Sequence, residues 1–262
     1  MKDKVTIQLQ FSEAPDFAEE ASDVTFGYLP MNNDTAGSAS SRAFTLIELL
    51  VVVAIISVLT GLLMPAIQLV QDRVRGASAR NTAHQVVVAV NAYYSEYGKL
   101  PDLGVSSGAP TANPDVIVGE PAANAVLPNG ALFDVLRDLD RGANAGYKQN
   151  PRRVIYFTGK AAANPNAPKD GFLDRAGTGP GANPANLGCL FDPWGRQFNV
   201  ILDSDHDNYL QIDSEYTDFA GAPPTGQRPQ AQVGVFSLGR DGQLGNGGSR
   251  ILRDSGDVAS WQ

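Results

Sequence analysis

The chain has a single cysteine and two histidines among its 262 residues. One cysteine excludes an intramolecular disulfide framework and any zinc cluster built on cysteines. The H-E-x-x-H and phosphate-loop patterns are also missing, so the residue sets of those two kinds of catalytic site are not available. With 20 basic against 28 acidic residues, the net charge of −8 repels the phosphates of nucleic acid. We therefore expect neither an enzyme nor a nucleic-acid-binding protein.

A long apolar run over residues 44–67 decides the class of protein. No residue from Leu49 to Gln71 is ionisable. As a helix, residues 49–67 would span about 28 Å, close to the hydrocarbon core of a bilayer. A buried helix of a soluble protein seldom stays apolar on every face for this length. Because no A-x-A-like cleavage site stands directly after the run, a membrane helix is favoured over an ordinary secretory signal.

Three residues distinguish this span from an ordinary membrane anchor. Glu48 lies just inside its N-terminal end, where an ionised carboxylate is costly without a partner. A position at the level of the lipid headgroups is the alternative for Glu48. Gly61 and Pro65 both disfavour a helix, and Pro65 also removes a backbone donor. We expect a kink at Gly61 and Pro65, which packing among copies of the chain would accommodate.

The start of the span has a family likeness. Arg42-Ala-Phe-Thr-Leu-Ile-Glu48, followed by an apolar helix, resembles the N-terminal signature of type IV pilins and type II secretion pseudopilins. The resemblance implies that a prepilin peptidase cuts between Ala43 and Phe44 and that Phe44 is then N-methylated. It also implies that Glu48 pairs with the amino terminus of a neighbouring subunit. Opposite charges attract strongly in a medium of low dielectric constant, which fits this pairing.

The helical pattern continues beyond the apolar run to about Tyr97, where Gly98 and Pro101 end it. Val87, Val90 and Tyr94 recur at three- and four-residue steps and are expected to face a core. We expect five segments. Residues 1–43 are a cytoplasmic leader that is removed, residues 44–71 a transmembrane and assembly helix, and residues 72–101 a helix continuing into the head. Residues 102–190 are a loop-rich insertion with one short helix, and residues 191–262 form a β-sheet with an acidic C-terminal loop.

Weaker patterns predict the elements of the head. Residues 131–141 form a short amphipathic pattern, and residues 153–158 and 197–202 are typical of strands. A further strand is expected over 209–212. These elements predict an α+β fold. The resemblance implies that this fold is of the pilin type, in which the long N-terminal helix packs on a small antiparallel sheet with a calcium-type C-terminal loop.

Asp203, Asp205 and Asp207 match the first three ligand positions of an EF-hand loop. The match then fails, because Asn208 replaces the glycine and Ser214 replaces the bidentate glutamate. A hairpin turn favoured by aspartate and asparagine is the preferred interpretation, with metal binding as the alternative.

The C-terminal stretch has a second likeness. Ser-Leu-Gly-x-Asp-Gly from Ser237 and Asp-Val-x-Ser-Trp from Asp257 resemble the calcium loop of major pseudopilins, as does Asp192-Pro-Trp-Gly. Calcium takes about six to eight oxygen ligands, which carboxylates and backbone carbonyls can supply. A surface turn without metal is the alternative. By the resemblance, the calcium ligand candidates are the Leu238 carbonyl and the side chains of Asp241, Asp254 and Asp257.

Together these resemblances imply a structural subunit of a type II secretion pseudopilus. It would cross the bacterial inner membrane once, with its head in the periplasm. The implied partners are copies of itself, other pseudopilins, the inner-membrane secretion platform and the prepilin peptidase. A type IV pilin for adhesion, motility or DNA uptake is the first alternative, although pilins often close the head with a disulfide that one cysteine cannot form. A membrane-tethered periplasmic enzyme is the second and least favoured alternative.

Overall fold

A computed structural model describes residues 44–105, 115–178, 182–212, 215–219, 228–253 and 255–262. The leader assigned to residues 1–43, which includes Ala43, lies outside the described residues. Two units divide the chain, with the boundary between Val53 and Ala54. In chain order, the helices and strands of the described residues are α1 (Leu46–Tyr97), β1 (Val116–Val118), α2 (Gly130–Leu136), β2 (Gly171–Phe172), β3 (Leu190–Phe191), β4 (Asn199–Leu202), β5 (Val233–Ser237) and β6 (Val258–Ala259).

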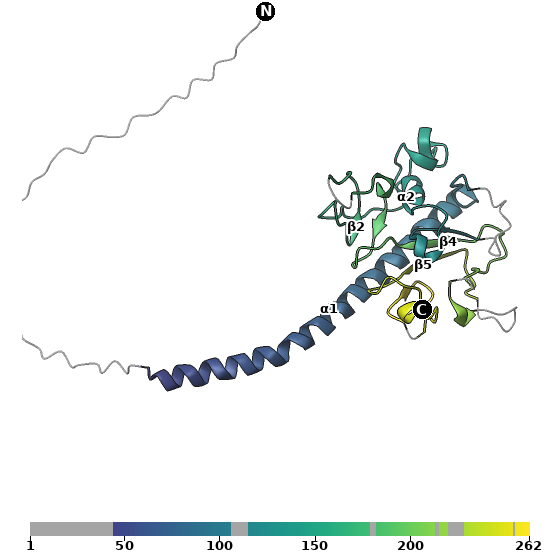
Figure 1. Ribbon diagram of the computed structural model, residues 1–262. Coiled ribbons are helices and arrows are strands. Elements are labelled where there is room, and N and C mark those ends of the chain that lie inside the picture. The colour runs from purple at the N-terminus through teal and green to yellow at the C-terminus, as the bar shows by residue number, and fades with distance from the viewer. Residues whose placement is uncertain (1–43, 106–114, 179–181, 213–214, 220–227, 254) are drawn as a thin grey trace, which may run out of the picture. The chain divides into compact units, whose positions relative to one another are not determined.

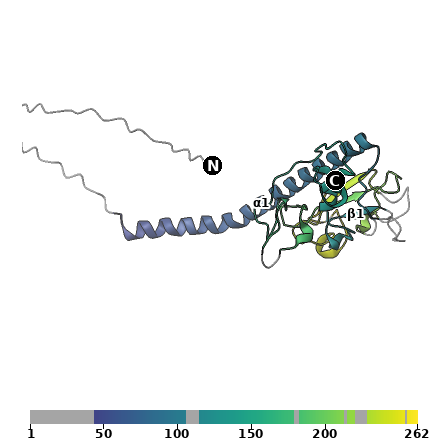
Figure 2. The same ribbon diagram turned by 90° about the horizontal axis from the view of Figure 1, so that it is seen from above.

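Helix α1 ends at Tyr97, as the sequence predicts. Gly98 adopts a φ of +65°, a left-handed conformation that glycine takes without steric cost, and its N–H donates to the Tyr94 carbonyl at 2.8 Å. The second half of α1 runs along the head (Figure 1, Figure 2). It buries a stripe with three- and four-residue spacing, made of Ala79, Ala83, Val86, Val90 and Tyr93.

The predicted stripe on α1 is therefore displaced by one residue at two positions. Val87 and Tyr94 are only half-buried, at the margins of the contact, whereas Val86 and Tyr93 are fully buried. Val88, on the opposite side, is 67% exposed although it is apolar. An apolar residue thus also lies on the exposed side of α1, and periodicity alone could not select the core face.

The main sheet is antiparallel, with the strand order β1-β4-β5-β6. Its side chains alternate between two faces. Val200, Leu202 and Val235 pack in the cluster that contains the α1 stripe. Ile201 and Phe236 pack on the other face, against a second cluster that includes Leu238 and Leu252 from the C-terminal loops. The sheet is thus a layer between α1 and the C-terminal loops, and the α+β pilin-like fold is confirmed.

The predicted strand over 209–212 is wrong. Leu210 donates its N–H to the Pro229 carbonyl at 2.9 Å, and Pro229 has no N–H with which to continue a ladder. The next N–H, of Gln211, goes to the carboxylate of Asp115 at 2.6 Å. The partners of β4 are instead β1 and β5. Leu210 and Ile212 are nevertheless buried in the second cluster. The apolar pattern over 209–212 therefore indicated buried positions and not a strand.

The insertion over 102–190 contributes to the core that covers α1. Helix α2 is shorter than the predicted 131–141, because Asp138 adopts a left-handed φ of +55° and the chain leaves the helix. The predicted strand over 153–158 is also wrong. The N–H groups of Tyr156 and Phe157 both donate to the Leu136 carbonyl, which caps the end of α2. Three phenylalanine rings pack with centroids 5.1–5.8 Å apart, those of Phe133, Phe157 and Phe172.

Candidate functional site

The start of α1 holds Glu48 in a capping box. The hydroxyl and N–H of Thr45 donate to Glu48 Oε2 at 2.9 and 3.0 Å, and the Glu48 N–H donates back to Thr45 Oγ1 at 3.3 Å. This reciprocal pattern satisfies backbone donors that a helix start leaves open. Phe44, immediately before it, is 81% exposed. Glu48 therefore has a local role in the single chain, and the cap occupies its Oε2.

The first half of α1 presents apolar side chains on all sides. Every residue from Leu46 to Met64 is exposed. Among the described residues, α1 alone is long and apolar enough to cross a membrane. Leu49, Leu59 and Leu62 are each more than half exposed. Soluble monomers rarely expose a contiguous apolar surface of this size, so lipid or other chains must cover it.

Gly61 and Pro65 lie within the helical part of this segment. A Cβ at Gly61 would meet no atom within 4 Å, so this glycine is not required for packing within the chain. The Thr60 hydroxyl donates to the Ile56 carbonyl at 2.7 Å, a bond that often accompanies bending. Pro65 cannot donate to the carbonyl four residues earlier. The kink at Gly61 and Pro65 stays a prediction.

The C-terminal loop brings part of the predicted calcium set to one region. Leu238 follows β5 directly, and Asp257 precedes β6, which pairs with β5. Asp241 is exposed, and its two carboxylate oxygens accept the N–H groups of Gln243 and Gly247, each at 3.1 Å. Asp254 lies outside the described residues.

Asp257 is the buried member of this set. Its Oδ2 accepts the Tyr216 hydroxyl and the Gly245 N–H, both at 2.8 Å. Its Oδ1 is buried and accepts no hydrogen bond from any residue that the structure describes. Burial, together with the nearby charge of Asp241, raises the pKa of Asp257 to about 6, although the hydrogen bonds from Gly245 and Tyr216 oppose the rise. An all-oxygen donor set with an unsatisfied buried carboxylate oxygen fits a calcium ion, which would bind this oxygen.

The segment that begins at Asp192 forms a turn, and Asp192 also bonds to the residue before the C-terminal loop. Oδ1 of the fully buried Asp192 accepts the N–H groups of Trp194, Gly195 and Arg196 at 2.8–2.9 Å. Its Oδ2 accepts the Ser237 hydroxyl at 2.5 Å, at the last residue of β5. Burial raises the pKa of Asp192, while these hydrogen bonds oppose the rise. Asp192 thus holds the backbone that enters the C-terminal loop.

The loop over 203–208 is organised by aspartates that accept hydrogen bonds from its own backbone. Asp203 Oδ2 accepts the Asn208 N–H at 2.9 Å, and Asp207 Oδ1 accepts the Tyr209 N–H at 2.7 Å. His206 and Asn208 adopt left-handed φ values of +60° and +64°. The predicted turn chemistry is therefore present, but among the described residues the next strand, β5, begins only at Val233.

Two residues of these sites were missed from the sequence. The cap formed by Thr45 could have been found, because T-x-x-E before an apolar run is the signature of a capping box. Asp115, which precedes β1, had no local signal. The register that pairs Val116 with Leu202 brings it beside Asp203, and only the strand pairing reveals this.

The exposed apolar helix with a capped glutamate at its start, leading into an antiparallel head, is the arrangement of an α+β pilin-like fold. In agreement, residues 38–64 match the family described as the prokaryotic N-terminal methylation motif. No solved structure matches the chain.

Similar curated proteins are pilins and fimbrial proteins. The type IV major pilin protein PilE1 of Neisseria gonorrhoeae is 33% identical over 103 residues, 39% of this chain and 61% of that protein. The fimbrial protein EcpC of Eikenella corrodens is 36% identical over 96 residues, 37% of this chain and 63% of that protein. A fimbrial protein of Neisseria meningitidis serogroup B is 32% identical over 91 residues, 35% of this chain and 52% of that protein. The chain thus spans between about half and two thirds of the length of these relatives.

Proposed function

We propose that the chain is a structural subunit of a type II secretion pseudopilus that assembles through α1. One observation carries this proposal. The side chains of residues 49–64 in α1 are all exposed, and this apolar segment directly follows the carboxylate of Glu48. A membrane anchor alone needs no acid at this depth, whereas a helix that packs against its copies can pair that acid with a positive group. Burial of the same surface in lipid before assembly and in protein afterwards accounts for its composition.

In this proposal a prepilin peptidase removes residues 1–43 and the amine of Phe44 is methylated. The new terminus is positive and lies one residue before the Thr45 cap. It pairs with Glu48 of a neighbouring subunit, where low dielectric strengthens the attraction. The chain crosses the inner membrane once, with its head in the periplasm. Other pseudopilins and the inner-membrane secretion platform are the further partners.

The C-terminal loop supports a pseudopilin in particular. Asp192 fixes Ser237 at the entry to the loop, and Asp257 offers a buried carboxylate oxygen at its exit. We propose that calcium joins the Leu238 carbonyl, Asp241, Asp254 and Asp257. The ion would rigidify the head, because a ligand that binds only the folded form stabilises it by mass action.

A type IV pilin is the second candidate. The relatives reported above favour it, because they are named as type IV pilins and fimbrial proteins. The similarity covers at most 39% of this chain in these three relatives.

Deleting the gene in the bacterium that produces the chain tests the choice between the two functions. For a pseudopilin, proteins normally found in the medium should accumulate inside the cells, and reintroducing the wild-type gene should restore their secretion. Surface filaments should be unchanged by electron microscopy. Normal secretion together with a loss of surface filaments would contradict the pseudopilin proposal and support a pilin.

A further inference from the structure

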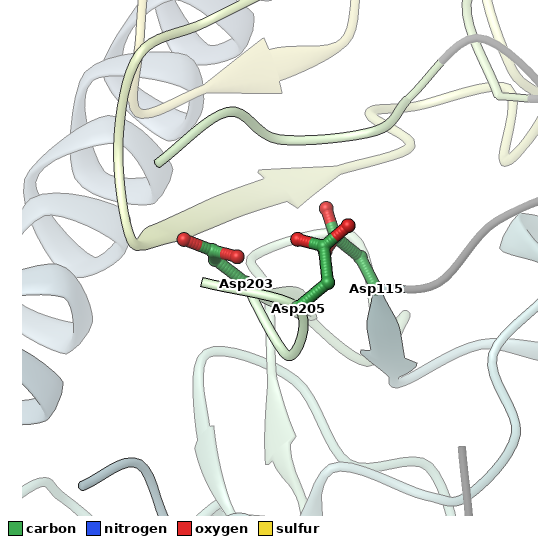
Figure 3. A group of neighbouring side chains, drawn as sticks. All are labelled: Asp115, Asp203 and Asp205. Atoms are coloured by element: carbon green, nitrogen blue, oxygen red, sulfur yellow. The ribbon is translucent and has the colours of Figure 1, made fainter. Parts of the chain in front are cut away.

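Three carboxyl groups meet where β1 begins and β4 ends. Asp115 precedes β1 and Asp203 follows β4, and the pairing of Val116 with Leu202 places the two residues side by side. Asp205 reaches the same place from two residues further along. One carboxylate oxygen from each residue lies within 4.8 Å of the others. Figure 3 shows Asp205 lying between Asp115 and Asp203, with its carboxyl group near both.

Asp203 provides an independent sign of a missing partner. Its side chain is almost completely buried, with 1% of the residue exposed. Oδ2 accepts the Asn208 N–H, but Oδ1 is buried and accepts no hydrogen bond within the described part of the chain. In Figure 3 one of the two carboxylate oxygens of Asp203 is on the side that faces Asp205. A buried carboxylate oxygen without a donor is strongly unfavourable, so a cation is the natural partner.

The charges around the three carboxyl groups also favour a bound cation. Neither Asp203 nor Asp205 forms a salt bridge with any lysine or arginine that the structure describes. Three carboxylates at this spacing repel one another, and a positive ion between them relieves that repulsion.

We propose that Asp115, Asp203 and Asp205 bind a calcium ion. The donors are all hard oxygens, which calcium prefers. Two oxygens that bind one calcium ion at its usual distances can be separated by up to about 5 Å, which accommodates the spacing found here. Asp205 is exposed, so water can complete the coordination from that side. Asp207 is not a member of this group, although the EF-hand-like pattern in the sequence placed it with Asp203 and Asp205.

This site is separate from the calcium loop at the C-terminus. Leu202 pairs with Val233, the first residue of β5, whereas Leu238 follows the last residue of that strand. The two sites therefore lie at opposite ends of β5. An ion at the first site would join β1, which has only three residues, to β4. The inference does not depend on whether the subunit belongs to a pseudopilus or a pilus.

Counting bound calcium tests the site. The full-length chain, purified in detergent and stripped with a chelator, is dialysed against calcium chloride, and the ions bound per chain are measured. Asp205→Asn should bind one calcium ion fewer than the wild type. Asp207→Asn is the matched control, because it removes the same charge from an exposed aspartate of the same loop and should bind as many ions as the wild type.

Asp205 is exposed, so its replacement should leave the fold intact, which near-ultraviolet circular dichroism can verify. A correctly folded Asp205→Asn chain that binds as many ions as the wild type would overturn the proposal. Loss of one ion from Asp207→Asn as well as from Asp205→Asn would also overturn it, because it would indicate a general charge effect of the loop. Comparison with Asp241→Asn separates the two sites, since that variant should lose only the C-terminal ion.

Discussion

Glu48→Ala is expected to abolish filament assembly while leaving removal of the leader and methylation intact. The substitution leaves the amino terminus of each neighbouring subunit without its partner at low dielectric. Breaking a buried charge pair in this way costs about 3–5 kcal/mol, which weakens each junction roughly a hundredfold or more. Immunoblots should show the processed chain at wild-type levels, and filaments sheared or pelleted from producing cells should be missing.

The capping box of α1 requires two matched variants, because Glu48 also accepts hydrogen bonds from Thr45. Glu48→Gln keeps a side chain that can complete the cap but removes the charge. Thr45→Ala removes the capping hydroxyl but keeps the charge. Charge pairing predicts that Glu48→Gln fails to assemble like Glu48→Ala, while Thr45→Ala still assembles. Assembly of Glu48→Gln together with failure of Thr45→Ala would show that helix capping is the function of Glu48.

Removing calcium should lower the melting temperature of the head by roughly 5–15 °C. This range follows from a ligand present at about 100 to 1,000 times its dissociation constant, which stabilises the folded form by about 2.7–4.1 kcal/mol. The measurement is a thermal melt of the full-length chain in detergent, with calcium and with a chelator.

Asp241→Asn provides the control for the C-terminal loop. Asp241 is exposed and its removal opens no cavity, so in the chelator the variant should melt close to the wild type. In calcium it should melt lower than the wild type, because one stabilising ion is lost. A wild-type melt that is the same in calcium and in chelator would refute calcium stabilisation of the head.

The long helix could be predicted because its signals are local. The apolar run, the glycine after Tyr97 and the proline beyond it each act within a few residues, and α1 ends at Tyr97 as expected. The face of α1 that packs against the core could not be predicted from the sequence equally well. Tyr93 and Tyr94 are adjacent and chemically alike, and only the packing of the head decides that Tyr93 is the buried one.

The elements of the head depend on contacts between distant residues. The segment 209–212 has an alternating apolar pattern, but its N–H groups bond to Pro229 and Asp115, so no ladder forms. Strand β1, with three residues, is too short for a pattern of its own. For the same reason the sequence pointed to Asp203, Asp205 and Asp207 as a group, while the fold brings Asp115 to the first two.

The mature N-terminus tests the central claim most directly. Mass spectrometry of the chain purified from the membranes of the bacterium that produces it, followed by sequencing of its first peptide, gives the first residue and its modification. Processing for assembly predicts a chain that begins at Phe44 with a methylated amine. A mature chain that still contains the leader, or that begins at any other residue, would contradict assembly through a charged terminus beside Glu48.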